Sequence, residues 1–444
     1  MGLTTEPTID EDERPPDRWP FAFNASRYNP WRGLGGLPRE IWLLFATNLI
    51  NRAGMMVLPF LTIYLTRGLH FSAARSGFVF AVYGATAIIA GPVAGKLSDR
   101  IGALPIMRAS LISSGTALLF FPFARTFESV VVVTALWAAC AEIFRPASLA
   151  AIAHVVSPAQ QKPAFALYRL AVNLGMSIGP ALGGFLATVS FHAMFVVDAG
   201  TSLVAGAVLS LATWTASTGG DNRSAPLNET QSVNEVSSVL PIPRVGVDSV
   251  FQDARFGVFL VASVVVGIVF YQHESALPLY MVQFLHMSPA FYGTLFTVNT
   301  IIIVAIEVPL NTLTARWPTT WSLVAGSALF AIGFGALALV STAPGVLGLV
   351  VVWTFGEMML FPAMAAHVTG VAPVSRRGTY MGAYSMSLSV ALTLGPWLGA
   401  QLLGSGGPKE VWSVMFALGA LGAILMVYAA PPHRRRRSLA AAGS

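Results

Sequence analysis

Residues 95–102 read GKLSDRIG and form a short polar segment between two apolar stretches, residues 74–95 and 104–123. The core of a bilayer is crossed by about twenty predominantly apolar residues in a helix. A helix satisfies its backbone hydrogen bonds internally, as lipid requires. The segment and its flanks therefore predict two membrane-spanning helices joined by a polar connection.

The composition of the whole chain agrees with this interpretation. Of its 444 residues, 55% are hydrophobic and only 10% are charged, whereas about 25% are charged in ordinary soluble domains. Apolar stretches of spanning length occupy residues 40–66, 74–95, 104–123, 128–153, 163–188, 192–214, 256–285, 289–315, 319–341, 344–370, 379–404 and 409–430. We therefore expect an all-α polytopic membrane protein with about twelve transmembrane helices.

Three sequence patterns occur twice, each time with nearly the same separation along the chain. They are Leu58-Pro59 with Leu277-Pro278, Glu142 with Glu357, and Gly179-Pro180-x-x-Gly183 with Gly395-Pro396-x-x-Gly399. A nearly constant separation indicates a duplicated pair of parallel halves. We predict two pseudo-symmetric six-helix bundles, residues 39–214 and 256–431, joined by a polar linker over residues 215–255.

The basic residues predict the orientation. Of the 26 Lys and Arg residues, nineteen fall in the terminal segments 1–38 and 432–444, the linker and the loops of one face. The opposite face holds Arg67, Arg75, Arg125 and Lys409. By the positive-inside rule, both termini are cytoplasmic in a plasma (inner) membrane. Because the arginines fall at the ends of apolar segments and in the closing run Arg434-Arg435-Arg436-Arg437, and do not form one continuous basic patch, we expect no nucleic-acid partner.

The segment between the second and third spans resembles motif A of the major facilitator superfamily, Gly-x-x-x-Asp-Arg-x-Gly. The fifth span resembles motif C, which is most associated with the superfamily's proton-coupled antiporters, through Gly175, Gly179, Pro180, Gly183 and Gly184. Ordinary close packing of helices also explains such glycines. With residues 377–382 at the eleventh span, the resemblance covers residues 38–431 and implies the major facilitator fold.

Motif A implies a conformational latch. In the family, its Asp lies near the N-terminal end of the eleventh helix in the outward-open state, where exposed amides attract an anion. The corresponding latch residues here are Gly95, Asp99, Arg100 and Gly102, with Arg145. The basic residues that usually follow the motif are replaced by Ala103 and Leu104, which predicts a weaker latch.

The first span has a weaker resemblance to the proton-dependent oligopeptide transporters. Asn48-x-x-Asn51-Arg52 lies where that family has Glu-x-x-Glu-Arg. Both glutamates are Asn here, and the tyrosines that follow are Met55 and Met56. Only Arg52 carries over, as a partner for a substrate carboxylate.

Charged residues within spans cost roughly 2.5–3.5 kcal/mol each, so they face water or a partner. The candidates for such a role are Arg52, Glu142, Arg145, Glu274, Glu307 and Glu357. Glu142 and Arg145 are three residues apart and can pair on one helix face. Either they form a permanent structural ion pair, or Glu142 carries a proton that is displaced during transport. Glu357 has no nearby Arg and is our first candidate for the proton carrier. Glu274 and His273 follow, with a hydrogen-bonded network as the alternative.

A substrate cavity is expected around polar and adaptable side chains of these spans. The candidates are Arg52, Asn48, Asn51, Met55, Tyr83, Trp137, Tyr271, Gln272 and Trp353. Thioethers and aromatic faces suit varied amphipathic ligands, although each of them also fits helix packing.

These features predict a monomeric secondary transporter in the lipid bilayer that works by alternating access. We expect proton-coupled efflux of small amphipathic compounds or drugs, without cofactor, metal or enzymatic activity. We expect the proton gradient to supply the driving force, and ATP-driven transport is disfavoured because the sequence shows no phosphate-binding loop. The alternatives are symport or uptake of a peptide, sugar or organic acid, and translocation of a lysophospholipid.

Overall fold

A computed structural model describes residues 34, 36–212, 214, 253–314, 317–373 and 376–430. These residues form helices and connections, and twelve of the helical segments are long and apolar enough to cross a membrane. The all-α, twelve-span prediction is therefore confirmed. The predicted tails and linker lie almost wholly outside the described residues.

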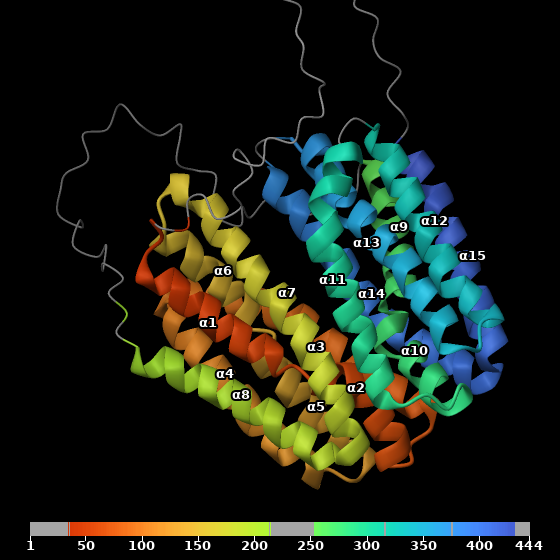
Figure 1. Cartoon of the computed structure of the whole chain (residues 1–444). Helices are drawn as coiled ribbons and strands as arrows, with labels where there is room; N and C mark the ends of the chain where they lie inside the picture. The colour runs from red at the N-terminus through yellow and green to blue at the C-terminus, as the bar shows by residue number, and fades with distance from the viewer. Residues whose placement is uncertain are drawn as a thin grey trace, which may run out of the picture.

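Two sets of six spans follow each other along the chain (Figure 1). The first set consists of α1 (Arg39–Ala53), α2 (Val57–Ile63), α3 (Ala73–Ile101), α4 (Ala103–Phe120), α5 (Phe127–Ala141), α6 (Phe144–Val155), α7 (Pro158–Val189) and α8 (Phe191–Leu211). The second consists of α9 (Ala254–Phe270), α10 (Ala276–Leu279), α11 (Pro289–Thr314), α12 (Thr319–Gly335), α13 (Ala343–Val371), α14 (Arg377–Ser405) and α15 (Gly407–Ala429). Short turns η1 (Tyr64–Gly68), η4 (Tyr271–Glu274) and η5 (Tyr280–Phe284) complete the first span of each set.

The two halves repeat in one constant register. The separation between helix starts is identical for four equivalent pairs, α3 with α11, α4 with α12, α5 with α13, and α8 with α15. His70 and His286, related by the same separation, both adopt a left-handed conformation, with φ of 59° and 52°. The predicted duplication is therefore confirmed, but Leu58-Pro59 and Leu277-Pro278 are displaced by about one helical turn from this register.

The GKLSDRIG segment is mostly helical. Helix α3 continues to Ile101, so residues 95–101 form its last two turns and not a loop. The turn into α4 is a single residue, Gly102, whose φ of 87° is unfavourable for any residue with a side chain. This explains the last glycine of the motif from local geometry.

The first span of each half is broken in the middle. In the first half, α1 ends at Ala53 and α2 begins at Val57. The backbone N–H groups of Met56 and Val57 donate to Asp198 Oδ2 of α8, at 3.0 and 2.9 Å. In lipid such freed groups need a partner inside the protein. Asp198 therefore holds the break in place.

The Gly-Pro runs of α7 and α14 pack against these breaks. A Cβ at Gly179 would lie 2.8 Å from the Arg52 carbonyl oxygen, and one at Gly395 would lie 3.1 Å from the Ile268 carbonyl oxygen. A side chain at Gly179 would force the backbone apart, and one at Gly395 would make an unusually tight contact. Close packing therefore accounts for both runs, and a link with antiport remains a prediction.

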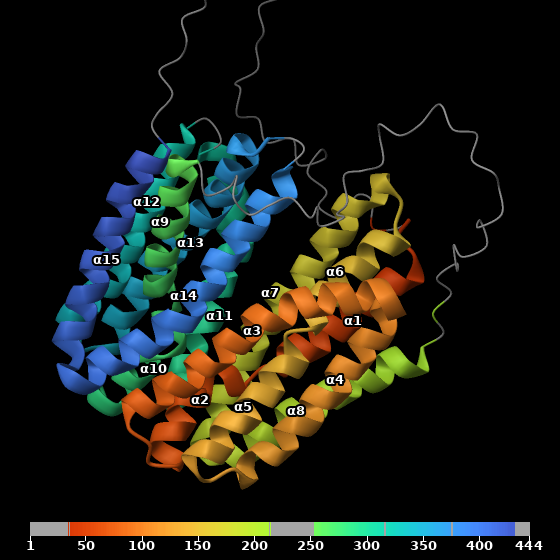
Figure 2. The same cartoon turned by 180° about the vertical axis from the view of Figure 1, so that it is seen from behind.

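The halves contact each other through α7 with α11 and α3 with α14 (Figures 1 and 2). We call the end with connections 69–72 and 285–288 the closed end and the end with Gly102 and Pro318 the open end. Arg67 Nη2 donates to the Val282 carbonyl at 2.7 Å and joins the halves at the closed end. Towards the open end the ribbons diverge, and no atom lies within 4 Å of a Cβ added at Gly91 or Gly382.

Gly84→Val is expected to destabilise the closed-end contact. The added Cβ would lie 2.8 Å from the Thr393 Cα, which cannot move away without shifting α14. We expect a loss of about 1–3 kcal/mol, measured as a lower melting temperature in detergent. Gly91→Val is the matched control, because that position has open space. An equal loss in both variants would contradict this arrangement.

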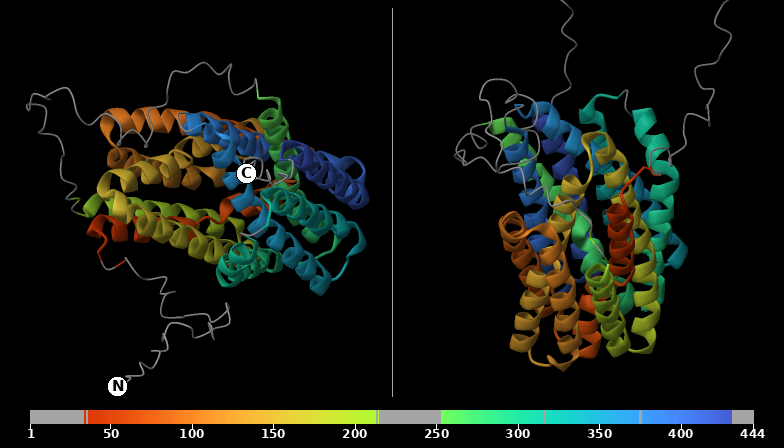
Figure 3. Two further views of the ribbon diagram at one scale, coloured as in Figure 1. Left: turned by 90° about the horizontal axis from the view of Figure 1, so that it is seen from above. Right: turned by 90° about the vertical axis from the view of Figure 1, so that its left-hand side faces the viewer.

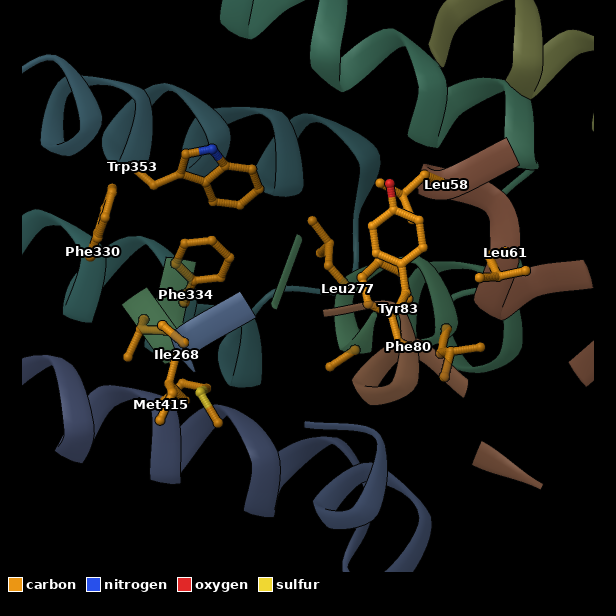
Figure 4. Packing of buried hydrophobic residues seen from close by; sticks show 14 of the residues in the cluster. Leu58, Leu61, Phe80, Tyr83, Ile268, Leu277, Phe330, Phe334, Trp353 and Met415 are labelled. Carbon is orange, nitrogen blue, oxygen red and sulfur yellow. The ribbon is translucent and has the colours of Figure 1, made fainter. Parts of the chain in front are cut away.

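Large side chains fill the interior of each half (Figure 4). In the second half, Phe334 and Trp353 stack with ring centroids 4.6 Å apart. In the first, Phe121 and Phe195 stack at 4.9 Å. The left view of Figure 3, from above, shows the two halves side by side. This packing fixes the helices that carry the polar side chains between the halves.

Candidate functional site

A cavity of about 160 Å³ lies in the second half, against α7 of the first. We call it the C-half cavity. Its walls include the rings of Phe270, Tyr292, Phe296 and Trp353, and its polar groups include Glu357. A mostly apolar pocket with few polar groups is typical of a small-molecule site.

Glu357 is held in this cavity by a neutral partner. Its Oε2 accepts a hydrogen bond from Asn299 Nδ2 at 3.0 Å, and the same amide donates to Thr354 Oγ1. No ion pair within the described residues involves Glu357. The side chain also lines an adjoining pocket of about 340 Å³ with Arg169 and Glu307. The carboxyl group is thus accessible and carries no permanent counter-ion.

A smaller polar pocket, of about 40 Å³, lies inside the first half, and we call it the N-half pocket. Its lining includes Arg52, Tyr83, Glu142 and Asp198. Tyr83 Oη donates to Glu142 Oε1 at 2.6 Å. Arg52 Nη1 lies 3.2 Å from Met55 Sδ, and Arg52 Nε is buried without a partner among the described residues.

The two acids are held in equivalent ways. Tyr83 and Asn299 occupy the same position within the equivalent helices α3 and α11. Each donates to the acid of the fourth span of its half, Glu142 or Glu357. The symmetry is only partial in chemical terms, because a phenol holds one acid and an amide the other.

The expected ion pair between Glu142 and Arg145 does not form in the described structure. Helix α5 ends at Ala141 and α6 begins at Phe144, so the two residues do not share a helical turn. Arg145 is exposed, and Glu142 bonds to Tyr83. Of the two alternatives, the structural ion pair was therefore wrong, because it assumed an unbroken helix, and the proton-carrier role of Glu142 stays a prediction.

The break in the seventh span carries the polar run Tyr271–Glu274. His273 Nε2 lies 3.3 Å from Glu274 Oε1, and Tyr292 Oη donates to the His273 carbonyl at 2.6 Å. Gln272 is fully buried, with its amide donating to the carbonyls of Ile268 and Gly395 at 2.8 Å. Gln272 therefore packs helices together.

Charges of both halves converge on Tyr271. Its hydroxyl lies within electrostatic reach of Arg145 and Glu142 from the first half and of Glu274 and Glu357 from the second. The structure thus brings together the acids that the sequence analysis selected separately.

Three further residues that were predicted to line a cavity, Asn48, Asn51 and Trp137, make contacts within the first half. Asn48 is fully buried and donates to the Leu44 carbonyl at 3.1 Å, and Asn51 donates to Ser202 Oγ at 3.3 Å. Trp137 is buried against Tyr83, with ring centroids 5.1 Å apart. These contacts are those of packing residues around the N-half pocket.

The latch stays a prediction. Gly95 and Asp99 lie in the last turns of α3, but the side chain of Asp99 is outside the described part of the structure. Arg100 is exposed at the open end.

Two charged residues were missed by the sequence analysis as site candidates. Asp198 lies in an apolar stretch, and the cost of burying a charge could have identified it. Arg169 of α7 forms an ion pair with Glu307 of α11 across the two halves. No local signal could have found that pair, because its members are 138 residues apart.

Known proteins resemble the chain along nearly its whole length. The family model described as Major Facilitator Superfamily matches residues 42–288 and 259–443. A Bacillus subtilis (strain 168) protein named uncharacterized MFS-type transporter YqjV is 29% identical, covering 87% of this chain and 93% of the relative. Multidrug resistance protein 1 of the same organism is 24% identical and covers 85% and 93%.

The solved structure of the nucleoside transporter NupG has a TM-score of 0.70 and 14% identity. It covers 88% of this chain and 99% of its own. At this identity the likeness concerns the fold alone.

Proposed function

Because the chain belongs to the Major Facilitator Superfamily, we propose that it exports small amphipathic organic compounds in exchange for protons. Family membership makes it an integral membrane transporter of small molecules and not an enzyme. The substrate class rests on the C-half cavity, whose aromatic walls enclose one carboxyl group without a counter-ion among the described residues. The name of the relative Multidrug resistance protein 1 supports the same class.

The mechanism follows from the position of Glu357. The open end is assigned to the cytoplasm by the positive-inside rule, so a compound enters from that side and reaches the carboxyl group. Glu357 releases its proton when the substrate binds and takes up another from the outside after the halves have rocked. Because proton and substrate use one group in turn, their movements are coupled in opposite directions.

Purified protein in liposomes tests this proposal. A thermal-shift screen first selects binders among amphipathic compounds, peptides, sugars and lysophospholipids. We expect an inside-acid gradient to drive uptake of an amphipathic binder into the vesicles. Uptake driven by an outside-acid gradient would instead support the alternative of symport, and a lysophospholipid as the only binder would support lipid translocation.

The Arg169–Glu307 pair is expected to hold α7 against α11 during this cycle. Glu307→Arg places two cations at the contact, and we expect about a fivefold slower transport, which corresponds to roughly 1 kcal/mol for an exposed pair. The double variant Arg169→Glu with Glu307→Arg restores the attraction and most of the rate. Equal rates in the single and double variants would show that the pair does not matter.

A further inference from the structure

At the break in the seventh span, the side chains of His273 and Glu274 contact each other. Their hydrogen-bond partners show how many protons the two side chains carry together. His273 Nδ1 lies 2.6 Å from the Phe270 carbonyl oxygen, which can only accept a hydrogen bond. Nδ1 therefore carries a hydrogen. The other ring nitrogen, Nε2, faces Glu274 Oε1 at 3.3 Å.

This contact requires one further proton. With both groups deprotonated, the lone pair of Nε2 would face a carboxylate oxygen, and two acceptors repel each other. An imidazolium beside a carboxylate resolves this, and so does an imidazole beside a carboxylic acid. Both arrangements contain the same number of protons, so His273 and Glu274 share a single one.

Among the described residues, Glu274 has no alternative partner that would hold it in place without this proton. Its side chain is buried, and its Oε2 has no hydrogen-bond partner among the described residues. A buried polar group without a partner is costly. Loss of the shared proton therefore removes the polar contact of Glu274 and forces the side chain to move.

The equivalent break in the first half is secured differently. There Asp198 accepts hydrogen bonds from two backbone N–H groups, which cannot lose their hydrogens. Val414 occupies the position in α15 that Asp198 occupies in the equivalent helix α8. The second half therefore has an apolar residue in place of this acid. The second break lacks that carboxylate and has the protonated pair.

His273 also forms part of the wall of the C-half cavity. The His273 ring packs on Phe270 and Phe296, with centroids 4.6 and 5.9 Å apart. Tyr292 of α11 bonds to the His273 carbonyl. A displacement of His273 therefore changes both the break and the shape of the cavity.

We propose that His273 and Glu274 form a second proton-binding site, separate from Glu357, whose proton holds the break in the seventh span. Loss of that proton opens the contact and releases η4 and α10. The ionisable side chains in electrostatic reach are Glu357 of α13, Tyr83 of α3, Tyr292 of α11 and Tyr271 of η4. The site deepens the proposed proton-coupled transport and rests on it for its role, but its existence can be tested without a substrate.

Nitrogen NMR of the full-length protein in lipid nanodiscs, labelled in the histidine rings, tests the proton count. The chain has seven His residues, and His273→Asn assigns the signal by its disappearance. We expect a hydrogen on Nδ1 throughout and one pH-dependent transition at Nε2. In Glu274→Gln the amide donates to Nε2, so the ring stays neutral with its hydrogen on Nδ1 and the transition is lost.

Glu142→Gln is the matched control, because it neutralises an acid of the first half and should leave the His273 transition unchanged. A neutral His273 with its hydrogen on Nε2, or an unchanged transition in Glu274→Gln, would overturn the proposal. The assignment with His273→Asn keeps an N–H group for the Phe270 carbonyl, which favours a folded reference protein.

Hydrogen exchange of residues 271–279 tests the link to the helix break. At one pH above the transition, we expect exchange in the natural protein to be about tenfold faster than in Glu274→Gln, since the amide retains the contact. Equal exchange would show that the proton does not hold the break. Neither measurement needs a transported compound, so their failure would leave the proposed export intact, and a failure of export would leave them unchanged.

Discussion

Glu357→Gln is expected to reduce uptake driven by an inside-acid gradient to about the level of protein-free liposomes. The amide can still bond to Asn299, whose Nδ2 lies 3.0 Å from Glu357 Oε2, so the cavity keeps its shape. It cannot exchange a proton, however, and the coupling between proton and substrate is lost. Exchange of labelled for unlabelled substrate without a gradient measures the binding that remains.

Two matched variants serve as controls for this result. Glu410→Gln changes an exposed acid in the first turn of α15 at the closed end, and transport should be unaffected. Glu142→Gln changes the equivalent acid, which bonds to Tyr83 in the first half. If Glu357→Gln retains full coupling while Glu142→Gln loses it, the proton carrier lies in the first half and our assignment is wrong.

Asp198→Val is expected to have the largest effect on stability. It removes the acceptor of the Met56 and Val57 N–H groups, which are buried at the break between α1 and α2. Each unsatisfied group costs about 1–3 kcal/mol, so the combined loss is about 2–6 kcal/mol. We expect a lower melting temperature in detergent and a lower yield of folded protein.

Asp198→Asn provides the control for this variant. Asn has nearly the same shape and keeps one side-chain oxygen as an acceptor. We expect it to lose less than half as much stability as Asp198→Val. If both variants are as stable as the natural protein, Asp198 does not support the break.

The repeated patterns illustrate how far the sequence predicts local structure. The Gly-Pro runs were recognised as equivalent, and both pack against the broken first span of their half. The residues after Glu142 were expected to continue the same helix. That expectation was wrong, because helix α5 ends at Ala141. Pro146 lies in the first turn of the next helix, where proline is tolerated, and it was a local sign of this restart.

The candidate site was predicted less completely than the fold. Glu357, Glu142, Glu274 and His273 were selected because acids and histidines are costly in apolar stretches. Their partners could not be selected in the same way. Tyr83 is 59 residues from Glu142, and Asn299 is 58 residues from Glu357. Such pairs depend on how whole helices pack.

The sequence by itself determined the twelve apolar spans, the duplication and the superfamily, because span length and repetition are properties of the chain alone. Even the GKLSDRIG segment revealed its family while its helical structure was missed. Only the tertiary structure decided that Asp198 caps a broken helix, that Arg169 meets Glu307, and that Glu357 lies in an aromatic cavity. The physical reason is that a buried charge must find its partner in three dimensions, and the partner's distance along the chain does not limit that choice.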